Sequence, residues 1–239
     1  MAVRIALLTT KSVPAVQCAR TLAAAYDLCG ILVRTAFPSL PFATTHALDD
    51  QQAAFEAETW FGGKAPALSD FAPVFPVTNM AGIDAAAAIR DLGPDAVVAL
   101  STGRLGQEIL DMMGTRAIVL HAGNPQDYRG ADTHLWAVYH GEEARLECVV
   151  QYAATEVNTG AILVNAPADL PSGLPLDGLR KVVTDGCIAG AMKVLKFFDE
   201  GGMLSVNRLQ RQGKVYTPMP AALKDYCVQQ YARRARGER

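Results

Sequence analysis

Continuous apolar runs alternate with stretches of helical periodicity along most of the chain. The first apolar run spans residues 3–9, apolar residues at helical spacing follow over 13–26, and a second β-prone run covers 29–33. This order predicts a β-α-β unit at the start of the chain. Strands that are apolar at every position, rather than at alternate positions, are typical of a parallel sheet that is covered on both faces.

The same alternation continues toward the C-terminus. Further strands are expected at 74–77, 96–100, 117–122, 146–152 and 161–165. Further helices are expected at 47–61, 83–92, 107–113, 131–141 and 174–198. Together these elements predict an α/β fold with an open, doubly wound, mostly parallel sheet, in which ligands bind beyond the carboxyl ends of the strands.

The pattern also divides the chain into two parts. Residues 1–200 form the expected α/β domain, and residues 201–239 form a C-terminal extension that begins at a glycine-rich junction over 200–203. From Met203 onward there are eight Lys or Arg residues and two Asp or Glu residues, so a short basic tail follows an acidic body. We expect a solvated surface helix there, with contact to an anionic partner as the alternative.

Composition and charge exclude several classes of protein. Of the 239 residues, 50% are apolar and 19% are charged, and no apolar run is as long as a transmembrane helix, so we expect neither a disordered nor a membrane-spanning chain. The first apolar run is short and is followed by Lys11, which predicts a cytoplasmic protein without an export signal. A net charge of -2 argues against a nucleic-acid partner. The five cysteines lack metal-ligand spacing, so reduced thiols and no metal site are expected.

The most informative polar residue is His121, which lies near the end of a predicted apolar strand. The turn after the first strand, from Thr9 to Ser12, contains neither a dinucleotide fingerprint nor a phosphate-binding loop. His121 instead places a titratable imidazole at the sheet edge where α/β proteins carry out their chemistry. The loop after it leads to a helix N-terminus, which can hold an anion or a carbonyl oxygen. The alternative is a buried histidine that is satisfied by a backbone carbonyl.

Four segments around His121 carry a resemblance to a known family. They are PDAVVALSTGRL at 94–105, the stretch 121–130 with its Tyr-Arg-Gly, WAVYHGE at 136–142 and EVNTGAIL at 156–163. With these segments, residues 3–165 resemble the formyltransferases that use 10-formyltetrahydrofolate, among them the glycinamide ribonucleotide, methionyl-tRNA and sugar N-formyltransferases. The resemblance implies a formyltransferase-like, Rossmann-like domain that transfers a one-carbon group.

The resemblance also implies a catalytic set of Asn, His and Asp, of which this sequence retains the histidine. His121 matches the family histidine, whereas Val119 stands at the asparagine position and Asn158 at the aspartate position. In formyl transfer the histidine and the asparagine stabilise an oxyanion, and the carboxylate supports the charged histidine. Val119 cannot donate a hydrogen bond. Polar residues that could replace the lost groups follow in the same loop and helix: Asn124, Asp132 and His134. The candidate catalytic residues are therefore His121, Asn158 and Asn124.

Further residues are assigned to ligands by the resemblance. The expected cofactor-binding residues are Ser101, Gly103, Arg104, Leu105, Thr155, Glu156 and Val157. The expected substrate-binding residues are Gly123, Tyr128, Arg129 and Asp132. The family's pterin site relies on main-chain groups, which survive side-chain replacement, so the resemblance supports binding of 10-formyltetrahydrofolate better than it supports transfer. Trp60 is expected either to line an acceptor pocket or to pack in the core.

The expected function is formyl transfer from 10-formyltetrahydrofolate to an amine of a small-molecule substrate. Because Val119 and Asn158 replace the usual residues, a different reaction in the same fold stays open: another acyl or carbamoyl transfer, a deformylation or a lyase step. A non-catalytic folate-binding or scaffold protein is a third hypothesis. The extension is too short for the β-barrel domain of methionyl-tRNA formyltransferase, so a tRNA acceptor is not expected. Small residues in the last long helix allow close packing, either within the chain or in a homodimer: Gly186, Gly190 and Ala191.

Overall fold

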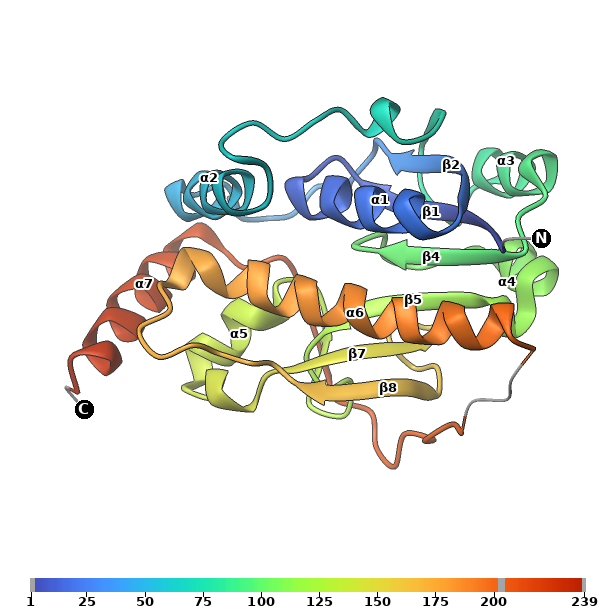
Figure 1. Ribbon diagram of the computed structural model, residues 1–239. Coiled ribbons are helices and arrows are strands. Elements are labelled where there is room, and N and C mark those ends of the chain that lie inside the picture. The colour runs from blue at the N-terminus through green and yellow to red at the C-terminus, as the bar shows by residue number, and fades with distance from the viewer. Residues whose placement is uncertain (1–2, 202–204, 238–239) are drawn as a thin grey trace.

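The protein is built on one large sheet, as a computed structural model that describes residues 3–201 and 205–237 shows (Figure 1). Its seven strands lie in the order β3-β2-β1-β4-β5-β7-β8. They are β1 (Arg4–Thr10), β2 (Asp27–Arg34), β3 (Val74–Val77), β4 (Ala96–Leu100), β5 (Ala117–Ala122), β7 (Glu147–Tyr152) and β8 (Ile162–Pro167). The first five pair in parallel, whereas β7 runs antiparallel to β5 and β8 antiparallel to β7.

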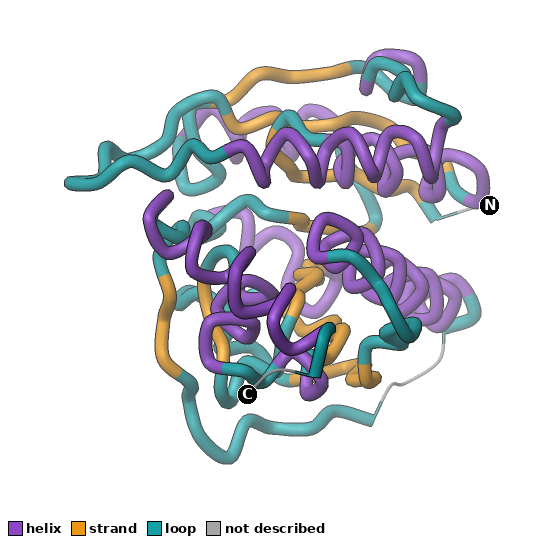
Figure 2. Tube along the Cα trace, turned by 90° about the vertical axis from the view of Figure 1, so that its left-hand side faces the viewer, coloured by secondary structure: helices purple, strands orange, loops and turns teal. Residues whose placement is uncertain are grey.

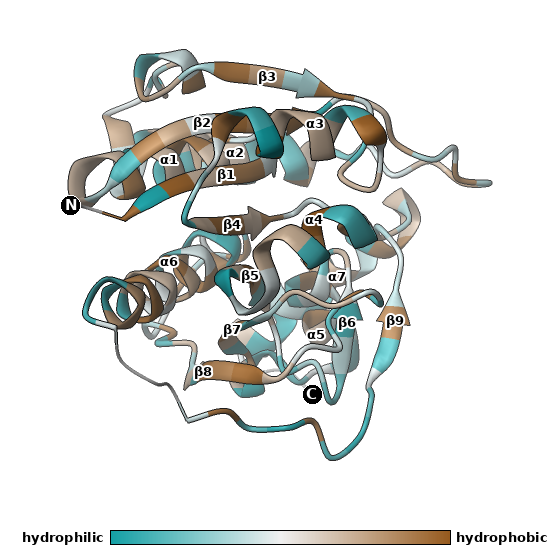
Figure 3. Ribbon diagram, turned by 90° about the vertical axis from the view of Figure 1, so that its right-hand side faces the viewer, coloured by the Kyte–Doolittle hydropathy of each residue, from teal (hydrophilic) through white to brown (hydrophobic). Residues whose placement is uncertain are grey.

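Helices cover both faces of this sheet. They are α1 (Val13–Ala25), α2 (Ala47–Phe61), α3 (Ile83–Leu92), α4 (Gln107–Met113), α5 (Thr133–His140), α6 (Leu179–Asp199) and α7 (Ala221–Ala235). Leu22 of α1 and Val194 of α6 belong to one buried apolar cluster, and Ile89 of α3 and Ile109 of α4 belong to a second. All five residues of β4 are buried, and this strand is uniformly brown in Figure 3. The prediction of a doubly wound, mostly parallel sheet is confirmed.

The last long helix begins later than its hydrophobic pattern predicts. The sequence favours a helix over 174–198, but α6 starts at Leu179 and is preceded by a short 3-10 turn at Leu176–Gly178. Pro175 explains the difference, because proline lacks an amide donor and disfavours helical geometry in the residue before it. No helix within the described residues is long and apolar enough to cross a membrane.

Helix α6 packs closely on β7 through two of its small residues. A Cβ atom added to Gly186 would lie 2.3 Å from Cys148 Sγ, and one added to Gly190 would lie 2.9 Å from Val150 Cγ2. Both distances are shorter than real Cβ contacts, so both glycines let the helix approach the strand. From the sequence, these glycines are expected to allow close packing either within the chain or in a homodimer, and the structure shows packing within the chain. A homodimer stays a prediction, and the packing of these glycines does not support it.

The C-terminal extension lies against the α/β domain instead of standing free in solvent. Its short strand β9 (Lys214–Tyr216) pairs in parallel with β6 (Tyr128–Gly130), and α7 packs on α5 with Lys224 and Cys227 buried. Figure 2 follows this connection along the edge of the molecule to the helix that ends at C. The expected surface helix is present as α7, which packs one face on α5 and exposes other residues, among them Asp225, Gln229 and Arg233. The junction expected at 200–203 lies partly outside the described residues, and the division at residue 200 stays a prediction.

The pairing of β6 with β9 depends on one glycine. Gly130 has a φ of 93°, and a Cβ atom there would lie 2.1 Å from the carbonyl oxygen of Tyr216. A larger residue would meet both a disfavoured backbone conformation and a steric clash. Gly130 thus fixes how closely the extension approaches the loop that follows His121.

Candidate functional site

His121 lies on β5 at the carboxyl end of the parallel strands, and the residue is 6% exposed. Its Nε2 atom is 2.7 Å from the carbonyl oxygen of Tyr128. Because a carbonyl only accepts, Nε2 carries the proton and Nδ1 carries the lone pair. Burial lowers the pKa of His121 to about 4, the Tyr128 carbonyl opposes this shift and Arg129 adds to it. The imidazole is therefore neutral at pH 7, and it is oriented by a backbone carbonyl.

His134, a second buried histidine, lies outside this cluster. It belongs to α5, is 5% exposed, and its Nε2 is 3.2 Å from Nε2 of Gln52 on α2. Burial lowers its pKa to about 3, and the nearby cations Arg180 and Lys224 lower it further. The structure places His134 in an interface between helices and gives it no contact with His121.

These two histidines make stability depend on pH. The folded protein keeps both neutral, whereas the unfolded chain binds protons near the ordinary histidine pKa of about 6.5. The unfolded state therefore binds more protons below about pH 6.5, and the free energy of unfolding should fall as the pH drops from there toward 4. Urea denaturation of the wild type at pH 7.5 and pH 5 measures this loss. His134→Gln should reduce it, and an undiminished loss in that variant would contradict the assignment to His134.

Asn158 occupies the position that the resemblance assigns to a carboxylate, and its side chain binds the backbone. It is 8% exposed, adopts a left-handed conformation with a φ of 55°, and its Oδ1 accepts a hydrogen bond from the amide of Gly130 at 3.0 Å. Arg129 Nε donates to the neighbouring carbonyl of Val157 at 2.9 Å. These bonds hold the loop after β7 against β6. Asn158 thus positions the backbone near His121. Among the described residues, its side-chain Oδ1 bonds to the Gly130 amide and not to the imidazole.

The other polar candidates near His121 also bond to the main chain. Asn124 Oδ1 accepts from the amide of Gln126 at 2.9 Å, as in a turn, and Asp132 Oδ2 accepts from the amide of Met219 at 2.8 Å. Gly123, at a φ of 118°, donates its amide to the carbonyl of Glu147 at 2.7 Å. The structure therefore gives Asn124, Gly123 and Asp132 positioning contacts and brings none of them into a hydrogen bond with the imidazole.

Two predicted cofactor segments, after β4 and after β7, lie face to face. Arg104 Nε donates to the carbonyl of Thr155 at 3.1 Å, and Thr155 Oγ1 donates to Gln107 Oε1 at 3.2 Å. Several predicted cofactor residues are exposed at this edge: Ser101, Gly103, Arg104, Thr155 and Glu156. Ser101 and Gly103 have positive φ values of 58° and 77°. Leu105 is 5% exposed and packs in the core, and Val157 is half-buried.

Sequence reasoning missed two residues that hold these segments. Gln107 begins α4 and contacts Thr155, and Arg34 at the end of β2 donates to the carbonyl of Thr102 at 3.1 Å. Arg34 could have been found, because it is a polar residue at the carboxyl end of a parallel strand. Nothing in the local pattern distinguishes Gln107 from an ordinary surface glutamine.

The side chains of Tyr128 and Arg129 bond to the second half of the chain. The hydroxyl of Tyr128 donates to Glu142 Oε2 at 2.5 Å, and its ring stacks on Tyr216 with centroids 5.4 Å apart. Burial and the Glu142 carboxylate raise the pKa of Tyr128 well above its usual value. Arg129 is 5% exposed and donates to Gln212 Oε1 at 3.1 Å. The contacts with Tyr216 and Gln212 hold the C-terminal extension against β6. A substrate role for Tyr128 stays a prediction.

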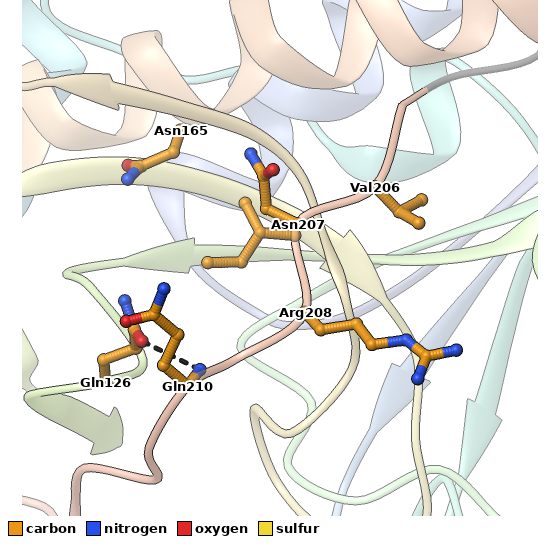
Figure 4. Close-up of a pocket in the computed structure, with 7 residues that line it drawn as sticks. Gln126, Asn165, Val206, Asn207, Arg208 and Gln210 are labelled. Carbon is orange, nitrogen blue, oxygen red and sulfur yellow. Dashed lines mark hydrogen bonds between the residues drawn. The ribbon is translucent and has the colours of Figure 1, made fainter.

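Two open cavities lie beside the C-terminal extension and are lined in part by its residues. One of about 540 Å³ is bordered by Tyr128, Glu142, Lys214 and Tyr216. The other, of about 460 Å³, is shown in Figure 4, where Gln126 Oε1 accepts from the backbone of Gln210 at 3.0 Å. Neither is lined by His121, so the edge between the cofactor segments, rather than either cavity, is the candidate ligand site.

Trp60 lies at the interface between α2 and α6. Its indole Nε1 donates to Asp185 Oδ1 at 2.9 Å, and its backbone carbonyl accepts from Arg20 at 2.9 Å. These bonds favour the packing role over a place in an acceptor pocket.

Comparison with known proteins finds similarity to this chain in sequence and in fold. Residues 71–174, which contain β4, β5 and the facing loop after β7, match the family model described as formyl transferase. This segment is therefore similar in sequence to formyl transferases. The chain is also 27% identical over 162 residues to methionyl-tRNA formyltransferase from Clostridium acetobutylicum, a match that covers 67% of this chain and 51% of that protein. The chain therefore aligns with about half the length of this curated relative.

Solved structures share the formyltransferase fold with this chain. Glycinamide ribonucleotide transformylase 1 from Symbiobacterium toebii superposes with a TM-score of 0.60 at 16% identity, covering 87% of this chain and 95% of that one. HypX from Aquifex aeolicus, solved with tetrahydrofolic acid, gives 0.61 at 14% identity and covers 94% of this chain and 31% of that one. The formyltransferase-like fold expected from the sequence is confirmed.

Proposed function

We propose that the protein transfers a formyl group from 10-formyltetrahydrofolate to an amine of a small metabolite. The observation that carries this proposal is the edge formed by the segments after β4 and β7, joined through Arg104 and Thr155, next to the strand that bears His121. The formyltransferase match spans these same elements.

The chemistry of this edge fits a folate. A pterin ring is flat and carries alternating hydrogen-bond donors and acceptors, which backbone amides and carbonyls can match. Ser101 and Gly103 are exposed residues with positive φ values, and the facing loop exposes Thr155 and Glu156. These residues would hold the pterin ring.

In this proposal His121 moves a proton. 10-Formyltetrahydrofolate supplies an activated formyl carbon to which an amine adds. His121 Nδ1, which carries the lone pair, takes the proton that the amine loses on attack, and the same proton is later returned to the departing folate nitrogen. The bond from Nε2 to the Tyr128 carbonyl keeps the ring in the required tautomer and orientation.

Folate binding and transfer are tested together. Calorimetry with 5-formyltetrahydrofolate should show micromolar binding, whereas p-aminobenzoylglutamate, which lacks the pterin, should bind far more weakly. Incubation with 10-formyltetrahydrofolate and a panel of amino sugars, amino sugar nucleotides and amino acids should yield a formylated amine by mass spectrometry. Equal affinity for the two ligands would contradict the pterin site. Formate in place of a formylated amine would show that deformylation is the reaction.

A further inference from the structure

Gln151 brings a primary amide to the face of the sheet that carries His121. In the antiparallel pair of β5 and β7, Gln151 lies directly opposite Val119. Residues opposite each other in such a pair point to the same face, and positions two apart on one strand also share a face. His121, Val119 and Gln151 therefore share one face, with His121 on the diagonal of Gln151, within reach of a long side chain.

The packing of neighbouring residues confirms this arrangement. Val119 and Ala153, which is two residues after Gln151, pack against the apolar cluster of α3 and α4. Cys148 and Val150 belong to the cluster on the opposite face. The side chain of Gln151 is therefore on the α4 side of the sheet, the side of the proposed folate edge.

The side-chain amide of Gln151 has an oxygen, Oε1, that is not used in any hydrogen bond with the described residues. The residue is 1% exposed, and this oxygen is buried. A buried polar atom without a partner is unfavourable, and an apolar residue of similar size would avoid that cost. Since the two ends of an amide differ by a simple rotation, either its oxygen or its N–H groups can face a ligand.

Addition of an amine to a formyl group requires a hydrogen-bond donor for the carbonyl oxygen, which gains negative charge. The Nε2 proton of His121 is held by the Tyr128 carbonyl, and Val119 has no donor to offer. Building on the proposed function, we propose that Gln151 is a catalytic residue whose amide N–H donates to the formyl oxygen as the charge develops. The partner that Gln151 lacks in the free protein is then the substrate.

Gln151→Leu tests this role with little risk to folding, because it removes an amide oxygen that has no partner. The expected result is a fall in kcat of about 10²–10³-fold, with an unchanged dissociation constant for 5-formyltetrahydrofolate and an unchanged or raised Tm. Adding Val119→Asn restores an amide from the opposite strand and should raise kcat of the leucine variant by about tenfold or more. If Gln151 had only a structural role, adding Val119→Asn would not restore kcat.

Gln17 provides a matched control, because its Oε1 is also buried without a partner but lies on α1. Gln17→Leu should keep the wild-type kcat. If the wild type transfers formyl groups and Gln151→Leu does so at the same rate, the proposed function stands and the role of Gln151 is wrong. If the wild type releases no formyl group from 10-formyltetrahydrofolate with any amine of the panel, both proposals are overturned.

Discussion

Replacing His121 with glutamine is expected to lower the rate of formyl transfer by about 10²–10⁴-fold, the usual contribution of a general base. Glutamine keeps an N–H group that can donate to the Tyr128 carbonyl, so the loop retains its partner. It has no basic nitrogen to take the proton from the amine. Steady-state kinetics with saturating 10-formyltetrahydrofolate measures the loss, and calorimetry with 5-formyltetrahydrofolate should show that binding survives.

The control for this variant is His46→Asn, which removes an imidazole at the N-terminus of α2 that bonds to Asp225 of α7 and keeps a residue type that caps helices. It should leave both kcat and folate affinity near the wild-type values. A glutamine variant of His121 that turns over as fast as the wild type would mean that His121 is a structural histidine held by a backbone carbonyl.

The largest effect on stability is expected from Glu56, a charged residue buried on α2. Its side chain is 0% exposed, and Arg180 donates to both carboxylate oxygens at 2.7 and 2.8 Å. Burial raises the pKa of Glu56, and Arg180 opposes that shift. Glu56→Ala leaves the guanidinium without its partner, and loss of one member of a buried pair costs roughly 3–5 kcal/mol. We expect about 3 kcal/mol, the lower end, because the Arg180 side chain is 27% exposed and can reach water.

Urea denaturation at pH 7.5 gives the free energy of unfolding for this comparison. The double variant Glu56→Leu with Arg180→Leu should recover most of the loss, since an apolar pair of similar volume avoids both desolvation costs. Glu200→Ala breaks an exposed pair with Lys196 and should cost less than about 1 kcal/mol. A loss in Glu56→Ala as small as in Glu200→Ala would show that the pair contributes little.

Much of the fold could be predicted from hydrophobic pattern alone. Strands such as β4 are apolar at every position, and in a chain of this length that pattern indicates a strand of a parallel sheet covered by helices on both faces. The strands β6 and β9 could not be predicted in this way. Each is three residues long, Tyr-Arg-Gly and Lys-Val-Tyr, and each exists only because the other lies beside it.

The buried face of α2 shows a second limit of pattern reasoning. Gln52 and Glu56 look like surface residues in the sequence, yet both are buried and bond to partners more than 80 positions away. The candidate site has the same limit. The position of His121 follows from strand order, but the bonds of Asn158 and Asp132 to distant backbone amides do not follow from local sequence.

The pairing of β6 with β9 has a consequence for biosynthesis. The segment that orients His121 through Tyr128 receives its neighbours Lys214–Tyr216 and Met219 from a part of the chain translated about ninety residues later. On the ribosome, the seven strands of the large sheet, which do not include β6, can pair before those residues leave the exit tunnel. The loop that orients His121 therefore gains these contacts only after residues 214–219 have emerged.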